Sequence, residues 1–216
     1  MNAISLLGTA LGLGLTSGLN LYATTFITGL LIRLGWLALP PSLDGLQVLA
    51  DPVVLVVSGV MFAVEALADK IPVVDHAWDL LHTVIRPVGA CVLAWRAVGG
   101  AAIPEPAEIA IILLAGGAAF STHSAKAGSR VAIAGSGGHL VGAGVGASLL
   151  EDGVALVLAP LAIAHPIVMF VIAVATLAVI GLLAVRIFRL LRTVPQTLQR
   201  VLRRGIGGRG GESSGR

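Results

Sequence analysis

Long apolar runs alternate with short polar breaks along almost the whole chain. The first run covers residues 3–32 and ends at Arg33. A straight helix needs about 20 residues to cross a bilayer, so this run is long, tilted or broken. The polar residues 16–20 mark the expected break. Either Asn20 and its neighbours line a cavity in a discontinuous helix, or Asn20 bonds a neighbouring helix while the hydroxyls bond back to helix carbonyls.

The later apolar runs predict five more membrane segments, so that the chain is an all-α bundle of about six. They cover residues 53–68, 88–98, 109–119, a glycine-rich segment over 135–150, and 167–185. The segment 88–98 is short for a span, so the alternative is that it begins in the preceding helix. Residues 154–164 are also apolar, but Pro160 interrupts them. Residues 36–51 contain Pro40 and Pro41 and are expected to form a loop with Trp36 at the membrane interface.

The densest group of charges lies between the second and third runs. Residues 74–86 have the period of an amphipathic helix, with Asp75, Asp79, His82 and Arg86 on one face. Charge between membrane segments has a high solvation cost unless the groups pair or face water. We therefore expect this helix to lie in the headgroup region or to cover a polar cavity.

Composition and charge strengthen the membrane interpretation. Only 12% of residues are charged and the mean hydropathy is +0.98, whereas soluble domains carry about 25% charged residues. Eight arginines fall within residues 186–216. Basic residues just after an apolar run predict a cytoplasmic tail on a protein of the cell inner membrane. Anionic lipid is the expected partner of this tail. Nucleic acid is not expected as a partner. Residues 1–204 are predicted to form a single transmembrane domain, and residues 205–216 a disordered basic tail.

The two halves of that domain, residues 1–100 and 105–192, share some spacing. Asp69 and His82 are 13 positions apart, and so are Asp152 and His165. Three segments in each half would make the second half inverted, as in many transporters with broken helices and a site at the repeat interface. This topology places both termini in the cytoplasm and Arg33 outside.

Polar residues of both halves are predicted to form one site. Glu65 and Asp69 lie one helical turn apart, so the pair can take up and release a proton, or Lys70 and Arg86 can neutralise it. His123, Lys126 and Arg130 form a basic turn that either binds an anion or a lipid headgroup, or pairs with the acids. The complete predicted site is Asn20, Glu65, Asp69, Lys70, Asp75, Asp79, His82, Arg86, His123, Lys126, Glu151, Asp152 and His165.

The motifs for catalysis and cofactor binding are absent from this sequence. Asp79 and His82, at i and i+3, are weak metal candidates without an HExxH-type motif. No GxSxG, P-loop or CxxC motif occurs, so nucleotide-driven transport by this chain alone and a cofactor are not expected, while enzymatic activity is left open. Cys91 is the single cysteine of the sequence and is predicted to be a small packing residue.

The stretch ADKIPVVDHAWDLLHTVIRP, with SGLNLYAT before it and STHSAKAGSR and EDGVALVLAPLAIAHP after it, resembles a bacterial integral membrane family. This family is catalogued as domain of unknown function 4126. The resemblance covers roughly residues 6–191 and implies a small polytopic inner-membrane protein, but no activity. The family pattern also includes Pro72 and Pro87 beside the charged residues of the predicted site.

Three hypotheses follow for the function. The leading one is a transporter or channel for an ion or small solute, coupled to protons through a carboxylate or His82. The second is a lipid-interacting or membrane-organising protein whose charge cluster is structural. The third is an intramembrane enzyme that acts on lipid. The sequence leaves open whether the protein forms a homo-oligomer.

Overall fold

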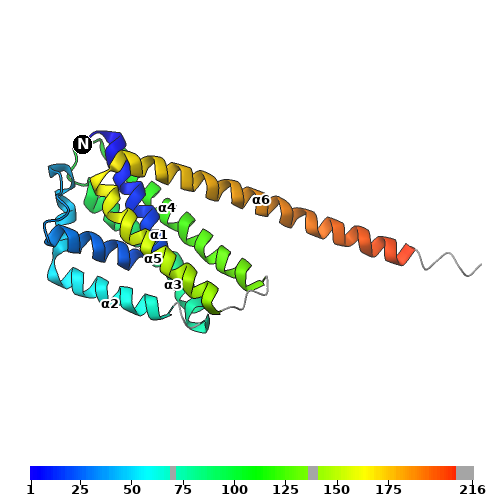
Figure 1. The fold of residues 1–216 in the computed structure, drawn as a ribbon. Helices are drawn as coiled ribbons and strands as arrows, with labels where there is room; N and C mark the ends of the chain where they lie inside the picture. The colour runs from blue at the N-terminus through cyan, green and yellow to red at the C-terminus, as the bar shows by residue number, and fades with distance from the viewer. Residues whose placement is uncertain (69–71, 136–140, 208–216) are drawn as a thin grey trace, which may run out of the picture. The chain divides into compact units, whose positions relative to one another are not determined.

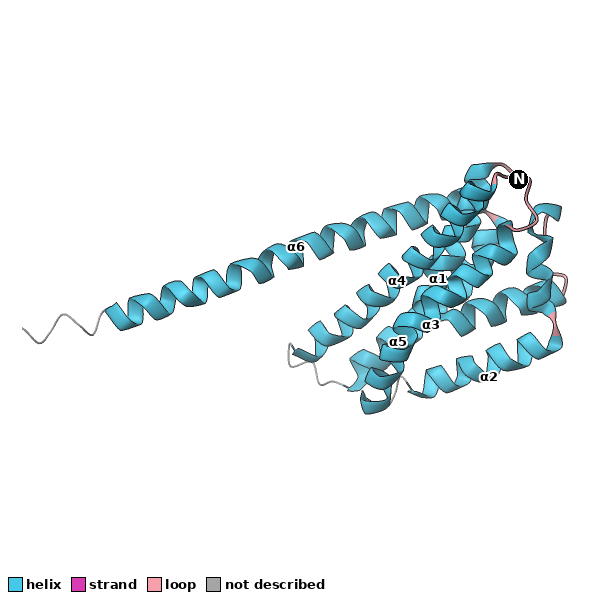
Figure 2. Ribbon diagram, turned by 180° about the vertical axis from the view of Figure 1, so that it is seen from behind, coloured by secondary structure: helices cyan, strands magenta, loops and turns pink. Residues whose placement is uncertain are grey.

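The computed structural model describes the backbone of residues 1–68, 72–135 and 141–207. It also describes their side chains, except at 72–77, 131–135, 141–145, 191 and 193–207. Figure 2 shows helices and connecting loops over these residues, with no strand, which confirms the predicted all-α class. The helices are α1 (Ala3–Arg33), the 3-10 helix η1 (Pro41–Ala50), α2 (Pro52–Ala68), α3 (Pro72–Val98), α4 (Glu105–Gly135), α5 (Val141–Ala164) and α6 (Pro166–Gly207).

Several of these helices have the length and composition of membrane spans. In the described part of the chain they are α1, residues 105–130 of α4, residues 146–164 of α5 and residues 166–190 of α6. The consecutive helices η1 and α2, bent by 67°, add a fifth if the pair is counted as one span. The chain is therefore a multi-pass membrane protein by composition and helix length, although the predicted six segments and inverted repeat are not supported.

Three helices differ from the boundaries that the sequence predicts. The expected loop over 36–51 contains η1. The predicted helix 74–86 and span 88–98 form one helix, α3, with Pro87 inside it. Residues 135–150 and 154–164 likewise belong largely to one helix, α5, with Pro160 inside it. Proline removes one backbone donor, but a helix inside a membrane bundle tolerates this loss where neighbours satisfy the freed carbonyl.

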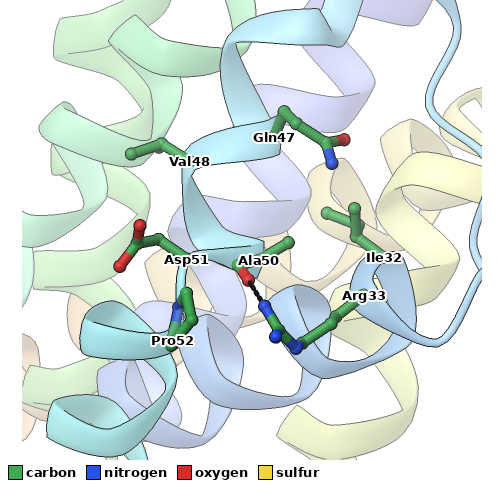
Figure 3. A pocket seen from close by; sticks show the side chains of 7 residues that line it. All are labelled: Ile32, Arg33, Gln47, Val48, Ala50, Asp51 and Pro52. Carbon is green, nitrogen blue, oxygen red and sulfur yellow. Dashed lines mark hydrogen bonds between the residues drawn. The ribbon is translucent and has the colours of Figure 1, made fainter.

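Two polar contacts fix the junction between α1, η1 and α2. Arg33 Nη1 donates to the carbonyl of Ala50 at 2.9 Å, which ties the end of α1 to the end of η1 (Figure 3). Asp51 Oδ1 accepts from the backbone N–H of Val53 at 2.8 Å, a bond that satisfies a free donor in the first turn of α2. These contacts hold the start of α2 beside the end of α1.

The long helix α1 consists of two segments joined at Asn20. The backbone angles there, φ −154° and ψ 106°, are not helical. We call residues 3–19 the first segment and residues 21–33 the second segment. The first segment runs parallel to α4, because Gly14 lies against Ala115 and Gly18 against Ala119. The predicted break is therefore present, and Figure 1 shows α1 turning sharply partway along its length.

Both ends of α1 lie at the same end of the bundle. The second segment returns to η1, where Gly29 lies against the carbonyl of Leu49. On the other side of η1, Arg96 Nε near the end of α3 donates to the carbonyl of Gly45 at 3.0 Å. The loop after α3 leads to the start of α4, which runs beside the start of α1. We call this end, with η1, the η1 end of the bundle.

Small residues let α1 approach its neighbours very closely. Gly8 and Gly12 face the start of α6, where a Cβ on Gly8 would lie 2.1 Å from the carbonyl oxygen of Pro166. Gly14 and Gly18 face α4, where a Cβ on either would lie 2.4 Å from a backbone oxygen. Each pair has the G-x-x-x-G spacing that brings membrane helices into backbone contact.

The outward faces of α2 and α3 are apolar. Side chains in α2 that are largely exposed in the isolated chain include Val53, Val56, Val57, Val60, Val64 and Leu67. On α3, Leu80, Leu81, Val84 and Val88 are exposed in the same way. Aliphatic surface of this extent is unfavourable in water and is expected against lipid tails.

Residues 178–216 form a compact unit separate from residues 1–177. This unit continues α6 as far as Gly207, and the guanidinium of Arg192 lies 4.3 Å from the centre of the Phe188 ring. Most of the predicted disordered tail, residues 205–216, lies outside the described residues.

We predict that Gly14→Ala destabilises the bundle, because its new Cβ would overlap the carbonyl oxygen of Ala115. Overpacking of this kind costs about 1–3 kcal/mol. The matched control is Gly117→Ala on α4, where a Cβ meets nothing within 4 Å. Thermal unfolding of the purified variants in detergent measures the difference. Equal melting temperatures for the two variants would show that the α1–α4 contact is loose.

Candidate functional site

The break in α1 leaves backbone groups without their usual helical partners. In a continuous helix the N–H of Ala23 would donate to the carbonyl of Leu19. Here it donates instead to Asn20 Oδ1 at 2.8 Å. Asn20 thus caps the second segment of α1 as an N-cap residue, while the carbonyl of Leu19 needs another donor.

Two cationic side chains supply donors to the carbonyls beside the break. Lys126 Nζ on α4 donates to the carbonyl of Leu19 at 3.1 Å. Arg86 Nη1 on α3 donates to the carbonyl of Gly18 at 2.7 Å. Both carbonyls belong to the C-terminal end of the first segment, which carries the negative pole of that segment's dipole. The cations therefore satisfy hydrogen bonds and helix electrostatics at the same time.

An acid from α5 completes the opposite side of the break. Asp152 Oδ1 accepts from Asn20 Nδ2 at 2.9 Å, and only 7% of Asp152 is exposed. The carboxylate lies next to the N-terminus of the second segment, the positive pole of that segment. Cations thus lie at the negative pole of the first segment, and the Asp152 carboxylate lies at the positive pole of the second segment.

Arg86 forms a fully buried ion pair in this group. Its Nη2 pairs with Glu65 Oε1 on α2, and neither side chain has any exposed surface. Its Nη1 also reaches Nδ1 of His123 at 3.0 Å. One guanidinium therefore connects α1, α2, α3 and α4. A buried pair of this kind has a desolvation cost of several kcal/mol per ion, offset only by good geometry and further hydrogen bonds.

The partners of the two buried histidines assign their tautomers. Arginine can only donate, so His123 Nδ1 accepts, and its Nε2–H donates to the carbonyl of Asp79 at 3.1 Å. His82 Nδ1–H donates to the carbonyl of Trp78 at 2.8 Å. In the neutral ring, His82 Nε2 then accepts from the hydroxyl of Tyr22 at 3.2 Å. Both rings act as oriented neutral connectors in this arrangement.

A second ion cluster lies further along α4, away from the η1 end. Lys126 Nζ lies 3.1 Å from Glu151 Oε2, and Arg130 lies 3.3 Å from the same oxygen. Arg130 Nη1 also lies 3.8 Å from Asp79 Oδ2 on α3. Glu151 is on α5, so these ions connect α3, α4 and α5. We call this cluster, the polar and charged side chains at the break, and the side chains that hydrogen-bond to them or stack on them the charge network.

The structure brings most of the predicted site residues together in this network. They are Asn20, Glu65, Asp79, His82, Arg86, His123, Lys126, Glu151 and Asp152. Asp69 and Lys70 lie outside the described residues, as does the side chain of Asp75.

His165 is placed elsewhere. It is exposed at the junction of α5 and α6, at the η1 end of the bundle. It follows Asp152 by 13 positions, about 20 Å along a helix at 1.5 Å per residue. The shared spacing that the sequence suggested therefore does not bring His165 to the break.

The weak metal candidates face different partners. Asp79 faces Arg130, while His82 contacts Tyr22 and Trp78. Among the described residues, no group of three or more histidine, cysteine, aspartate or glutamate side chains is arranged to hold a metal ion.

Four side chains of the network are missing from the predicted site. Tyr22 contacts His82, Trp78 stacks on the His82 ring with centroids 4.8 Å apart, and Thr83 lies 3.3 Å from His123. The fourth, Arg130, belongs to the predicted basic turn, because it follows Lys126 by four positions and so shares its helix face, but it is not among the predicted site residues. That spacing was a usable signal, whereas Tyr22 and Thr83 look like ordinary helix residues until the fold is known.

Comparison with known proteins identifies a family. The model of a family described as Domain of unknown function (DUF4126) matches residues 7–186. No curated protein and no solved structure matches the chain.

We predict that Arg86→Met lowers the unfolding free energy by about 3–5 kcal/mol, the usual loss when one partner of a buried ion pair is removed. The substitution removes the cation that pairs with Glu65 and the donor to the carbonyl of Gly18. The double variant Glu65→Leu/Arg86→Met is expected to cost less than the sum of the two single variants. Denaturant unfolding in detergent tests this.

The control is Arg186→Met on the exposed face of α6, which should change stability by no more than about 0.5 kcal/mol. Additive losses in the double variant would show that Glu65 and Arg86 contribute independently.

Proposed function

Since the chain belongs to the DUF4126 family, whose description states no activity, we propose a function from the site itself. The protein is a small transporter or channel for an ion or small solute, and its pathway passes the break in α1. The observation that carries this proposal is the placement of Glu65, Arg86, Lys126 and Asp152, each at most 7% exposed, around an interrupted membrane-type helix. Ionisable groups at such positions commonly mark ion or substrate pathways.

Interrupted helices in transporters bind ions through the carbonyls and N–H groups that the break exposes. In this protein, Lys126 and Arg86 occupy those carbonyls. We infer that this is a resting arrangement, in which the protein's own cations hold the positions that a transported ion or polar solute takes. Protonation of Asp152 would remove the charge beside Asn20 and change the balance of the network, which couples transport to protons.

The path of α1 adds a proposal about topology. Its first and second segments form a re-entrant hairpin that enters the membrane from the η1 end and returns there, with Asn20 at the tip. Lys126 and Arg130 lie far along α4 from that end, but Arg33 and Arg96 lie at it, so these four cations do not decide the orientation. The eight arginines after residue 185 follow an α6 that begins at the η1 end, and by the positive-inside rule they favour a cytoplasmic location for the opposite end. The N-terminus and Arg33 are then both outside, unlike the topology expected from the sequence.

We also retain two proposals about the surroundings of the bundle. The protein resides in the cell inner membrane with its C-terminus in the cytoplasm, where the arginines of α6 contact anionic lipid. Arg186, Arg189 and Arg192 are exposed and suit that role.

A second candidate function is supported by the completeness of the pairing. Glu65, Lys126, Glu151 and Asp152 each have an ionic or hydrogen-bonding partner. A network that only fastens helices in a membrane-organising protein would have the same contacts. The two functions differ in the expected effect of replacing Asp152 by a neutral residue. If the network only fastens helices, the variant loses stability; if the protein is a transporter, the variant loses flux.

We predict a flux defect without unfolding for Asp152→Asn. Asparagine keeps an acceptor for Asn20 Nδ2 but cannot carry charge or exchange the proton. In proteoliposomes with an internal pH dye and an imposed potential, wild-type protein should show proton or solute flux, and the variant at least about tenfold less, a loss typical of a removed proton-transfer group.

The control is Glu105→Gln in the exposed first turn of α4, which should retain flux. If the wild-type protein moves no proton, ion or small solute, transport is excluded. If Asp152→Asn unfolds while Glu105→Gln does not, the fastening role is favoured.

The topology is tested by single cysteines in a Cys91→Ser background. Ala3→Cys at the start of α1 and Ala38→Cys shortly after its end, both at exposed positions, should react with an impermeant maleimide from the same side of the membrane. Ser129→Cys lies 24 residues from the start of α4, about 36 Å at 1.5 Å per residue, and should react from the other side. Labelling of Ala3→Cys and Ala38→Cys from opposite sides would mean that α1 crosses the membrane.

A further inference from the structure

An apolar cavity of about 640 Å³ lies between the second segment of α1, η1, α2 and α3. Its size falls within the range of about 300–1,000 Å³ that is usual for ligand pockets. Its wall is mainly aliphatic, with Val48, Val57 and Val92 among the lining residues. Tyr22 and Arg96 are its largest polar side chains. We call this the apolar chamber.

A smaller and more polar cavity of about 410 Å³ follows the chamber along α3. Positions 89, 92, 93 and 96 of α3 line the chamber, and positions 95, 96, 99 and 100 line the smaller cavity. Arg96 therefore belongs to both, and the two cavities succeed one another toward the η1 end. Asp44 and Trp95 also line the smaller cavity, which we call the vestibule.

The vestibule contains opposite charges that are not bonded to each other. Arg96 Nε donates to the carbonyl of Gly45. Within the described residues, the two terminal nitrogens of Arg96 have no hydrogen-bond acceptor, and Asp44 has no salt bridge. A guanidinium is suited to bind a phosphate through two parallel hydrogen bonds, and a carboxylate is suited to an ammonium group.

The surroundings place this pair of cavities at the edge of a bilayer. Trp95 is 52% exposed beside the vestibule, and Trp36 is 78% exposed in the turn after α1. Tryptophan is enriched where membrane meets water. Val57 and Val92 are exposed as well as lining the chamber, so the chamber opens to the lipid-facing side between α2 and α3. An apolar chamber below a charged vestibule matches the order of groups in a phospholipid.

We propose that the two cavities bind one phospholipid with a primary-amine headgroup. One acyl chain fills the apolar chamber as far as Tyr22, the phosphate binds Arg96, and the ammonium group binds Asp44. The presence of both charges distinguishes this ligand from an anionic lipid, whose headgroup Asp44 would repel. The inner end of the acyl chain reaches Tyr22, whose hydroxyl donates to His82. A lipid in the chamber therefore contacts the charge network at Tyr22.

Native mass spectrometry of the full chain with added phosphatidylethanolamine or phosphatidylglycerol tests the proposal. Val57→Trp fills the chamber, whereas its neighbour Val56, exposed but absent from the chamber lining, gives the matched control Val56→Trp. Arg96→Gln removes the phosphate partner, and Asp44→Asn removes the ammonium partner. Melting temperatures of all four variants show whether each one is folded.

The wild-type protein and Val56→Trp should bind phosphatidylethanolamine at least tenfold more tightly than phosphatidylglycerol. Val57→Trp and Arg96→Gln should each weaken phosphatidylethanolamine binding tenfold or more, and Asp44→Asn should abolish the preference between the two lipids. Unchanged binding in a folded Val57→Trp variant would overturn the chamber as the site. A wild-type preference for phosphatidylglycerol would overturn the choice of headgroup.

Discussion

The interrupted turn at Asn20 is the constraint on which the rest of the bundle depends. A break in the middle of a membrane protein exposes carbonyls and N–H groups that no solvent there can satisfy. Asn20 caps the N–H of Ala23, and the side chains of Arg86 and Lys126 donate to the carbonyls on the other side. Each cation then requires an acid, which Glu65 and Glu151 provide from α2 and α5. One local irregularity thus dictates where the charges of four other helices lie.

Much of this arrangement is encoded in patterns that can be recognised without coordinates. The helix class follows from the apolar runs, and the break follows from the polar residues before Asn20. The common location of Glu65, Arg86 and Lys126 was predictable because isolated charges in apolar surroundings must pair. Backbone partners were not predictable, since any carbonyl can accept and only the fold decides which ones are free. The continuity of α3 through Pro87 depends in the same way on neighbours that the sequence does not name.

The reversal of α1 is the feature that sequence patterns conceal most effectively. Its length and apolar character equal those of a spanning helix, and Arg33 ends it as an interfacial arginine would. Only tertiary contacts, such as Arg33 with Ala50 and Arg96 with Gly45, show that the second segment returns to the η1 end. Hydropathy measures whether a segment prefers lipid or the protein interior to water. It contains no information about whether the segment crosses the membrane or turns back within it.

The glycine contacts of α1 determine which neighbours each of its two segments packs against. Gly14 and Gly18 place the first segment directly on the backbone of α4, and interfaces packed this closely resist sliding. The second segment contacts α2 through the Phe26 ring, which lies against Gly59. Asn20, between them, is the residue at which the backbone of α1 leaves the helical conformation. The first segment is therefore shaped to lie on α4 and the start of α6, whereas the second segment is shaped to lie on η1 and α2, so one interrupted helix serves two separate packing interfaces.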